Sequence, residues 1–85
     1  MNKTIKLRVK KEIEEDKELK VLKLKGTLIS RGYTEIIHIA DENEDFHLNT
    51  FTTLQDQKKE VENYILDYIS SHNVNDIITL VSTVK

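Results

Sequence analysis

Apolar and charged residues alternate near the start of the chain, and this alternation constrains the fold more than any other feature. Ile5, Leu7 and Val9 take every second position, and the residues between them are basic. Successive side chains of a strand point to opposite faces of a sheet, so this spacing predicts a half-buried strand over residues 5–13. The strand would turn an apolar face to a core and a basic face to solvent.

A second strand is predicted to follow after a short turn. The run 14–18 is too polar to bury and indicates the turn, and residues 19–30 are interpreted as the strand. Val21 falls out of phase, which is typical of a bulge. The inner face of this strand would carry Leu22, Leu24, Gly26 and Leu28.

Two further strands complete a predicted antiparallel meander. Arg31 and Gly32 have the length of a two-residue hairpin loop, with the glycine supplying a positive φ. The third strand is predicted at 33–40 and the fourth at 46–51, joined by a polar turn at 41–45.

The periodicity then changes from that of a strand to that of a helix. Thr52 and Thr53 offer N-caps, and asparagine tolerates a left-handed cap, so the helix should end near His72 and Asn73. Residues 77–84 predict a last strand, placed beside the first. The apolar stripe of the helix consists of Leu54, Val61, Tyr64, Ile65, Tyr68 and Ile69.

These elements predict an α+β fold. It has an antiparallel four- to five-stranded sheet in the order ββββαβ, with one helix packed on one face. The 85 residues are expected to form one domain, since halves of this length would be too short to bury their own cores. An open sheet and a closed barrel are both compatible with the pattern.

Composition excludes some classes of protein. The chain has no cysteine, so it has neither a disulfide nor a thiolate zinc site. No apolar run approaches the ~18 residues of a membrane span, and the basic start is not followed by the apolar stretch of a signal peptide. A cytoplasmic location without membrane contact is therefore expected.

Charge is distributed unevenly along the chain. Residues 1–31 contain ten basic and five acidic residues, a net charge of +5, whereas residues 32–85 contain three and ten, a net charge of −7. This asymmetry bears on partners rather than on the fold. The predicted register collects cations on the outer sheet face: Lys6, Arg8, Lys10, Lys23 and Lys25. The predicted helix presents an acidic face: Asp56, Glu60, Glu62 and Asp67.

The predicted outer sheet face also has a less charged part. A register that pairs Ile39 with Phe46 places five residues there: Ile29, Ile36, Phe51, His38 and His47. Exposed apolar side chains grouped on a small chain favour a binding site for a protein partner or a second copy. The two histidines fall short of the three or four ligands of a usual zinc site, so no metal site is predicted.

No arrangement of residues predicts catalysis or a cofactor, and a domain this small has little room for a substrate pocket. We therefore expect a non-catalytic protein-binding module that acts through the outer sheet face or the acidic helix. The Lys- and Ile-rich composition, free of Cys, Trp and Pro, is similar to that of small proteins of AT-rich bacteria and their phages. This similarity implies an inhibitor of a bacterial host or defence protein.

The alternative is a nucleic-acid-binding protein that uses the basic sheet face, because lysines neutralise backbone phosphates without reading sequence. The sequence leaves open which charged side binds, which partner it binds, and whether the chain forms a homodimer.

Overall fold

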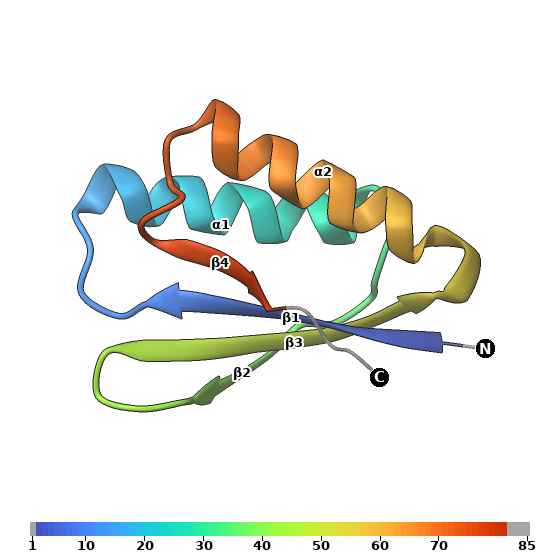
Figure 1. The fold of residues 1–85 in the computed structure, drawn as a ribbon, viewed down its shortest axis with the longest axis horizontal. Helices are drawn as coiled ribbons and strands as arrows, with labels where there is room; N and C mark the ends of the chain where they lie inside the picture. Colours follow the sequence, from blue (N-terminus) through green and yellow to red (C-terminus); the bar gives the residue numbers. More distant parts are fainter. Residues whose placement is uncertain (1, 82–85) are drawn as a thin grey trace.

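A computed structural model describes residues 2–81, which form a four-stranded antiparallel sheet and two helices (Figure 1). The strands are β1 (Asn2–Lys10), β2 (His38–Asp41), β3 (Phe46–Leu54) and β4 (Ile78–Val81). The helices are α1 (Glu15–Ser30) and α2 (Lys58–Ser71), and a 3-10 turn, η1 (Gln55–Gln57), precedes α2. The chain order βαββαβ and the sheet order β2-β3-β1-β4 are those of the ferredoxin-like, or split β-α-β, arrangement.

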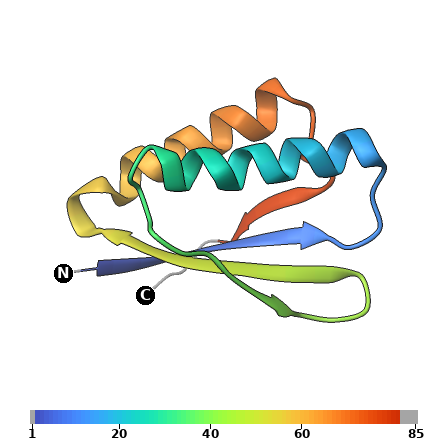
Figure 2. The same cartoon turned by 180° about the vertical axis from the view of Figure 1, so that it is seen from behind.

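Both helices cover the same face of the sheet, and the other face is open (Figures 1 and 2). The core lies between the helices and the covered face. It consists mainly of Ile5, Leu7, Val9, Leu24, Leu28, Phe51, Val61, Ile65, Val74 and Ile78. The α+β class and the antiparallel sheet are therefore confirmed, whereas the order ββββαβ with a single helix is wrong in part.

The largest error is at α1, which occupies the predicted second strand and begins within the predicted turn. Its buried residues, Val21, Leu24 and Leu28, are spaced by three and four positions, as on one side of a helix. Leu22, predicted to be inside, is 54% exposed. The alternation of leucine with lysine was misleading because both residues favour helix, and only the helical interpretation accounts for Val21.

The end of α1 explains Gly32, which was assigned to a hairpin loop. Gly32 has a φ of 79° and follows the C-cap residue Arg31. The backbone N–H groups of Gly32 and Tyr33 donate to the carbonyls of Ile29 and Leu28 at 3.0 and 3.1 Å, which is the Schellman pattern. A helix end and a tight hairpin both require a left-handed residue, so the glycine alone does not distinguish them.

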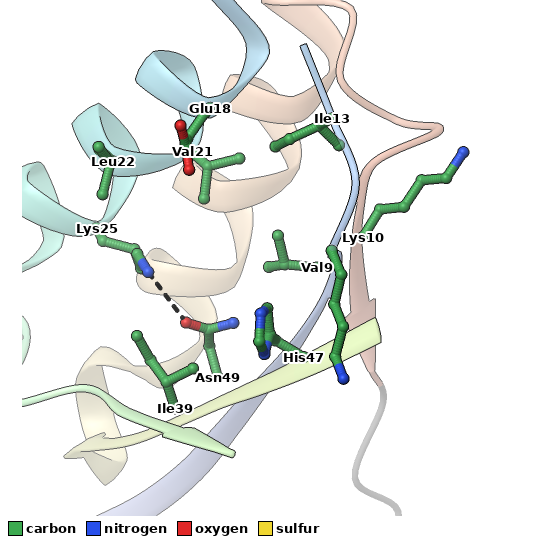
Figure 3. A pocket seen from close by; sticks show the side chains of 11 residues that line it. Val9, Lys10, Ile13, Glu18, Val21, Leu22, Lys25, Ile39, His47 and Asn49 are labelled. Carbon is green, nitrogen blue, oxygen red and sulfur yellow. Dashed lines mark hydrogen bonds between the residues drawn. The ribbon is translucent and has the colours of Figure 1, made fainter. Parts of the chain in front are cut away.

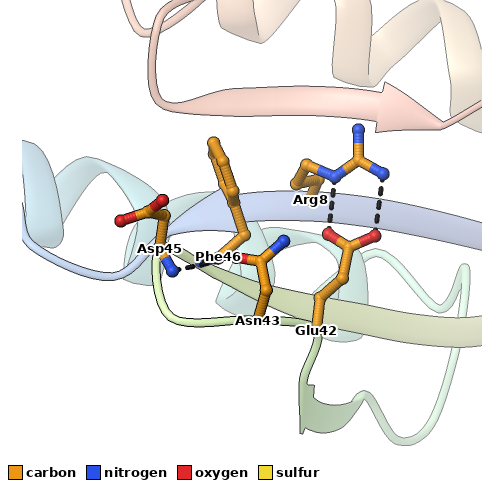
Figure 4. Close-up of polar contacts among 5 residues, drawn as sticks. All are labelled: Arg8, Glu42, Asn43, Asp45 and Phe46. Atoms are coloured by element: carbon orange, nitrogen blue, oxygen red, sulfur yellow. Dashed lines mark hydrogen bonds and ion pairs between the residues drawn. The ribbon is translucent and has the colours of Figure 1, made fainter.

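The β2–β3 hairpin is closed by a side chain of its own loop. The Oδ1 atom of Asn43 accepts hydrogen bonds from the backbone N–H groups of Asp45 and Phe46, at 2.8 and 3.0 Å (Figure 4). The backbone N–H of Glu42 donates to the carbonyl of Phe46 at 3.0 Å. These contacts fix the register of the two strands.

That register differs from the predicted one by three residues. Ile39 lies opposite Asn49 rather than opposite Phe46, and β2 starts only at His38. An odd shift in register exchanges the two faces of a strand. The side chain of Phe51 therefore points toward the helices, where it was predicted to point outward.

Most of the remaining predictions hold for the described residues. β4 pairs with β1, as predicted for the last strand, and residues 82–84 of that prediction lie outside the described residues. α2 ends at the C-cap His72, and Asn73 has a φ of 54°. The predicted N-caps Thr52 and Thr53 are instead part of β3, so α2 begins later than expected.

Replacing Gly26 by alanine is expected to raise the free energy of unfolding by about 0.5–1 kcal/mol, because glycine within a helix is less favourable than alanine. A Cβ at Gly26 would meet no atom within 4 Å. Gly32→Ala should instead lower the free energy of unfolding by about 1 kcal/mol, because a Cβ is unfavourable at positive φ. Urea unfolding followed by circular dichroism measures both changes. If both substitutions stabilised the chain, or both destabilised it, the helical assignment of α1 would be contradicted.

Candidate functional surfaces

The open face of the sheet is the first candidate surface. Lys6, Arg8 and Lys10 lie on it, as predicted, because they alternate with the buried residues of β1. Lys23 and Lys25 do not, since both are on α1 in the opposite layer. The predicted basic face is thus reduced to a single row of cations on β1.

One of these three cations is already paired. Nε and Nη2 of Arg8 donate to the two carboxylate oxygens of Glu42 at 2.6 and 2.8 Å (Figure 4). The guanidinium also lies 5.9 Å from the centre of the Phe46 ring, within the range of a cation–π contact. A bidentate pair of this kind neutralises the charge of Arg8. The other two cations of the row, Lys6 and Lys10, form no ion pair within residues 2–81.

The hydrogen bonds from Arg8 hold the pKa of the Glu42 carboxyl below its usual value. We expect Arg8→Met to return this pKa to the ordinary range in an NMR titration of the carboxyl carbon. The folded pKa lies below the unfolded one, so the contribution of Glu42 to stability is present above the unfolded pKa and is lost as pH falls through the folded pKa. A Glu42 pKa that does not respond to Arg8→Met would contradict the pairing.

The predicted apolar part of the outer face does not form. Ile29 is on α1 and Ile36 is in the connection from α1 to β2, and both are exposed. Phe51 is 1% exposed and belongs to the core. The prediction required residues 29 and 36 to lie on neighbouring strands, which the helix α1 excludes.

The two histidines lie on opposite faces of the sheet. His38 pairs with Thr50 on the open side, whereas His47 pairs with the buried residue Val9 and faces the helices. Among residues 2–81, no group of three metal-binding side chains is close enough to hold an ion.

The predicted acidic helix face is partly engaged within the chain. Glu60 accepts a hydrogen bond from the Tyr33 hydroxyl at 2.9 Å, and Glu62 pairs with Lys58 at 2.9 Å. Asp67 is exposed on α2, and Asp56 is exposed on η1 rather than on the helix. The face therefore presents less free charge than the sequence indicated.

Exposed apolar side chains also occur on α1 and β2, and two of them, Leu22 and Ile39, line one hollow. Leu19, Leu22 and Ile29 follow one another at helical spacing on the exposed side of α1, and Ile39 lies on the edge strand β2. We call these four residues the α1–β2 surface. They are four of the seven large exposed apolar residues in the described part of the chain, and such grouping is unusual for a surface that only meets water.

A hollow of about 190 Å³ opens on this surface (Figure 3). Leu22 and Ile39 line it together with further apolar side chains, and its polar lining includes Glu18, Lys25, His47 and Asn49. The Lys25 ammonium donates to Oδ1 of Asn49 at 3.3 Å, and Asn49 is 1% exposed. Burial lowers the pKa of Lys25, and no carboxylate in residues 2–81 forms an ion pair with it. A partly buried cation that forms no ion pair in a hollow marks a candidate site.

His47 completes the floor of the hollow. Its Nδ1 atom is buried and has no hydrogen-bond partner among the described residues, although Oδ1 of Asp41 lies 3.4 Å away. The same carboxylate oxygen is 3.3 Å from Nζ of Lys11, and most of the Asp41 side chain is exposed. Lys25, Asn49 and His47 thus bring three nitrogen-bearing side chains to one floor, which suits a carboxylate or carbonyl oxygen.

No protein-family model, curated protein or solved structure matches this chain. In the part of the chain that the structure describes, no helix combines the length and apolar character needed to cross a membrane.

The predicted sites did not include Leu19, Leu22 or Asn49. A helical signal was present for the first two, because residues 15–30 contain a second apolar stripe beside the buried one. No local signal marks Asn49, since its burial depends on the pairing of β3 with β1, opposite Leu7, and on the position of α1.

Proposed function

We propose that the chain is a small non-catalytic protein-binding module that binds its partner on the α1–β2 surface. The observation that carries this proposal is the exposure of Leu22 and Ile39 around a hollow in which Lys25 forms no ion pair with residues 2–81, although Glu18 also lines that hollow. A partner that covered Leu22 and Ile39 and placed a carboxylate beside Lys25 would remove the apolar exposure and pair with the ammonium group.

The edge strand β2 indicates the form of that partner. Because the backbone N–H of Glu42 donates to Phe46 and bonding directions alternate along an antiparallel pair, the backbone groups of Ile39 and Asp41 point away from β3. An extended segment can pair with these groups and add a strand to the sheet. The chemistry of the surface favours a segment with an apolar and an acidic residue two positions apart, because residues i and i+2 of a strand point to the same face.

A protein that acts by covering a partner surface needs no catalytic group. We accordingly extend the proposal to an inhibitor of a bacterial host or defence protein, which is the class that the composition resembles. The α1–β2 surface replaces the outer sheet face and the acidic helix as the proposed contact.

Selection of a random-peptide library displayed on phage, with the wild-type chain as bait, tests the proposal. The selected peptides are expected to carry an apolar and an acidic residue two positions apart, and to bind Leu22→Asp at least about tenfold more weakly than wild type. Leu66→Asp is the matched control, since Leu66 is an exposed leucine on α2. Peptides that bind Leu22→Asp as tightly as wild type would place the binding surface elsewhere.

A second candidate function, nucleic-acid binding, is favoured by one observation: Lys6 and Lys10 lie in a row on the uncovered sheet face. It predicts oligonucleotide binding that weakens log-linearly with salt and is abolished by Lys6→Glu combined with Lys10→Glu. Lys23→Glu combined with Lys59→Glu changes the net charge equally on the helix layer and should leave binding largely intact. Fluorescence anisotropy measures these affinities, and absence of binding even at low salt would end this candidate.

A further inference from the structure

We propose that the partner of the α1–β2 surface is a second copy of this chain, whose β2 pairs antiparallel with β2 of the first. The inference rests on the proposed function and names its partner. Such a pair is isologous, since each copy offers the same strand and the same apolar side chains to the other. The two four-stranded sheets become one continuous sheet, with both α1 helices on the same face.

The exposed edge of β2 defines the register of this pair. The outward-pointing backbone groups belong to Ile39 and Asp41, so each Ile39 pairs with Asp41 of the other copy, and the two Ala40 residues meet at the symmetry axis. This register uses only residues that are already extended in β2. A register with Asp41 opposite its own copy would place two carboxylates side by side.

The side chains beside this edge fit the register. Ile39 and Asp41 point to the helix side of the sheet, because they lie opposite Asn49 and His47. Residues directly opposite in an antiparallel pair lie on the same face, so Asp41 of the second copy enters the helix side next to Ile39. Ile39 lines the hollow that contains Lys25, as Figure 3 shows.

Charge complementarity supports a second copy as the occupant. Lys25 forms no ion pair within residues 2–81 of one copy. Asp41 lies on the same edge, with Oδ1 3.3 Å from Nζ of Lys11 and 3.4 Å from Nδ1 of His47, and its side chain is 76% exposed, so it can also face a second copy. The two-fold pair brings Lys25 and Asp41 together twice, once on each side of the axis. Leu22 and Ile29 lie on the same side of α1 as Lys25, and Leu22 lines the hollow with Ile39.

Sedimentation equilibrium of the wild-type chain and two charge variants tests the inference. The wild type is expected to be in reversible monomer–dimer equilibrium. Lys25→Glu alone places a second carboxylate against Asp41, and Asp41→Lys alone places a second ammonium group against Lys25. Each single variant should therefore dimerise at least about tenfold more weakly than wild type.

An equimolar mixture of the two variants should restore association to near the wild-type level. In the mixed dimer, the altered side chains face each other across one half of the interface and the original Lys25 and Asp41 face each other across the other half. Circular dichroism of each variant alone confirms that the fold is retained. Two defects in folding would not correct each other on mixing, so recovery is specific to the proposed contact.

The outcomes separate this inference from the proposed function. A wild type that stays monomeric to millimolar concentration, or a mixture that gains nothing over the single variants, overturns the second copy as partner. The peptide selection would still report on the α1–β2 surface in that case. A dimer that is unaffected by Leu22→Asp but broken by Leu48→Asp on the open face would overturn the surface itself.

Discussion

Phe51→Ala is expected to lower the free energy of unfolding by about 3–5 kcal/mol, the usual cost of removing a fully buried aromatic side chain. The ring is 1% exposed and lies opposite Ile5 in the centre of the sheet, beneath the two helices. A chain of 85 residues has a total unfolding free energy of roughly 4–13 kcal/mol. The substitution should therefore remove a large part of the stability, with a marked fall in the urea midpoint.

Leu54→Ala is the matched control for this prediction. Leu54 is on the same strand, β3, but it is 53% exposed and points to the open face. Its removal should change the unfolding free energy by no more than about 0.5 kcal/mol. If Phe51→Ala were as mild as Leu54→Ala, the register of β3 would be wrong and Phe51 would belong to a surface.

A second large effect is expected from a pair of neighbouring substitutions in α1. Val21→Asp should destabilise the chain by at least about 3 kcal/mol, because it buries a carboxylate without a partner. Leu22→Asp should leave the fold intact, since Leu22 is exposed. The ratio of folded to unfolded chain in urea, followed by circular dichroism, measures both.

The order of the two effects distinguishes a helix from a strand over residues 19–30. A strand with Leu22, Leu24 and Leu28 inside would make Leu22→Asp the damaging change and Val21→Asp the tolerated one. The helix reverses this order, because its buried residues are Val21, Leu24 and Leu28. Equal tolerance of both substitutions would contradict either structure.

Local pattern was sufficient for the elements whose burial follows one clear period. Ile5, Leu7 and Val9 alternate and are buried in β1, and the stripe that contains Val61, Ile65 and Tyr68 is buried on α2. The pairing of β4 with β1 was also predicted correctly. In these segments the buried side chains alone show the spacing of a strand or of a helix, so the secondary structure can be predicted from them.

Local pattern was insufficient for α1, where two periods coexist. Leu22, Leu24 and Leu28 fit an alternation, whereas Val21, Leu24 and Leu28 fit a helix, and both sets lie in the same segment. The acidic residues before them, interpreted as a turn, form the first turn of the helix, where negative charge is favourable. The length of the apolar segment and its acidic start were the signals that favoured a helix.

The candidate site depended on this assignment. Once α1 is a helix, Lys25 moves from the outer sheet face to the hollow beside Asn49, and Ile29 moves to the stripe that contains Leu22. The inward position of Asn49 depends on the pairing of β3 with β1, which places it opposite the buried Leu7, and the β2–β3 register places Ile39 beside it. The spacing of apolar residues predicts neither the position of Lys25 nor the inward position of Asn49.

Amide chemical shifts of the wild-type chain, recorded by NMR at increasing protein concentration, test the central claim most directly, namely that the α1–β2 surface binds a second copy of the chain. The account predicts that the shifts that change with concentration belong to residues 19–29 of α1 and 36–41 around β2. Shifts that instead change around Lys6, Leu48 and Thr79, which lie on the open sheet face, would contradict it.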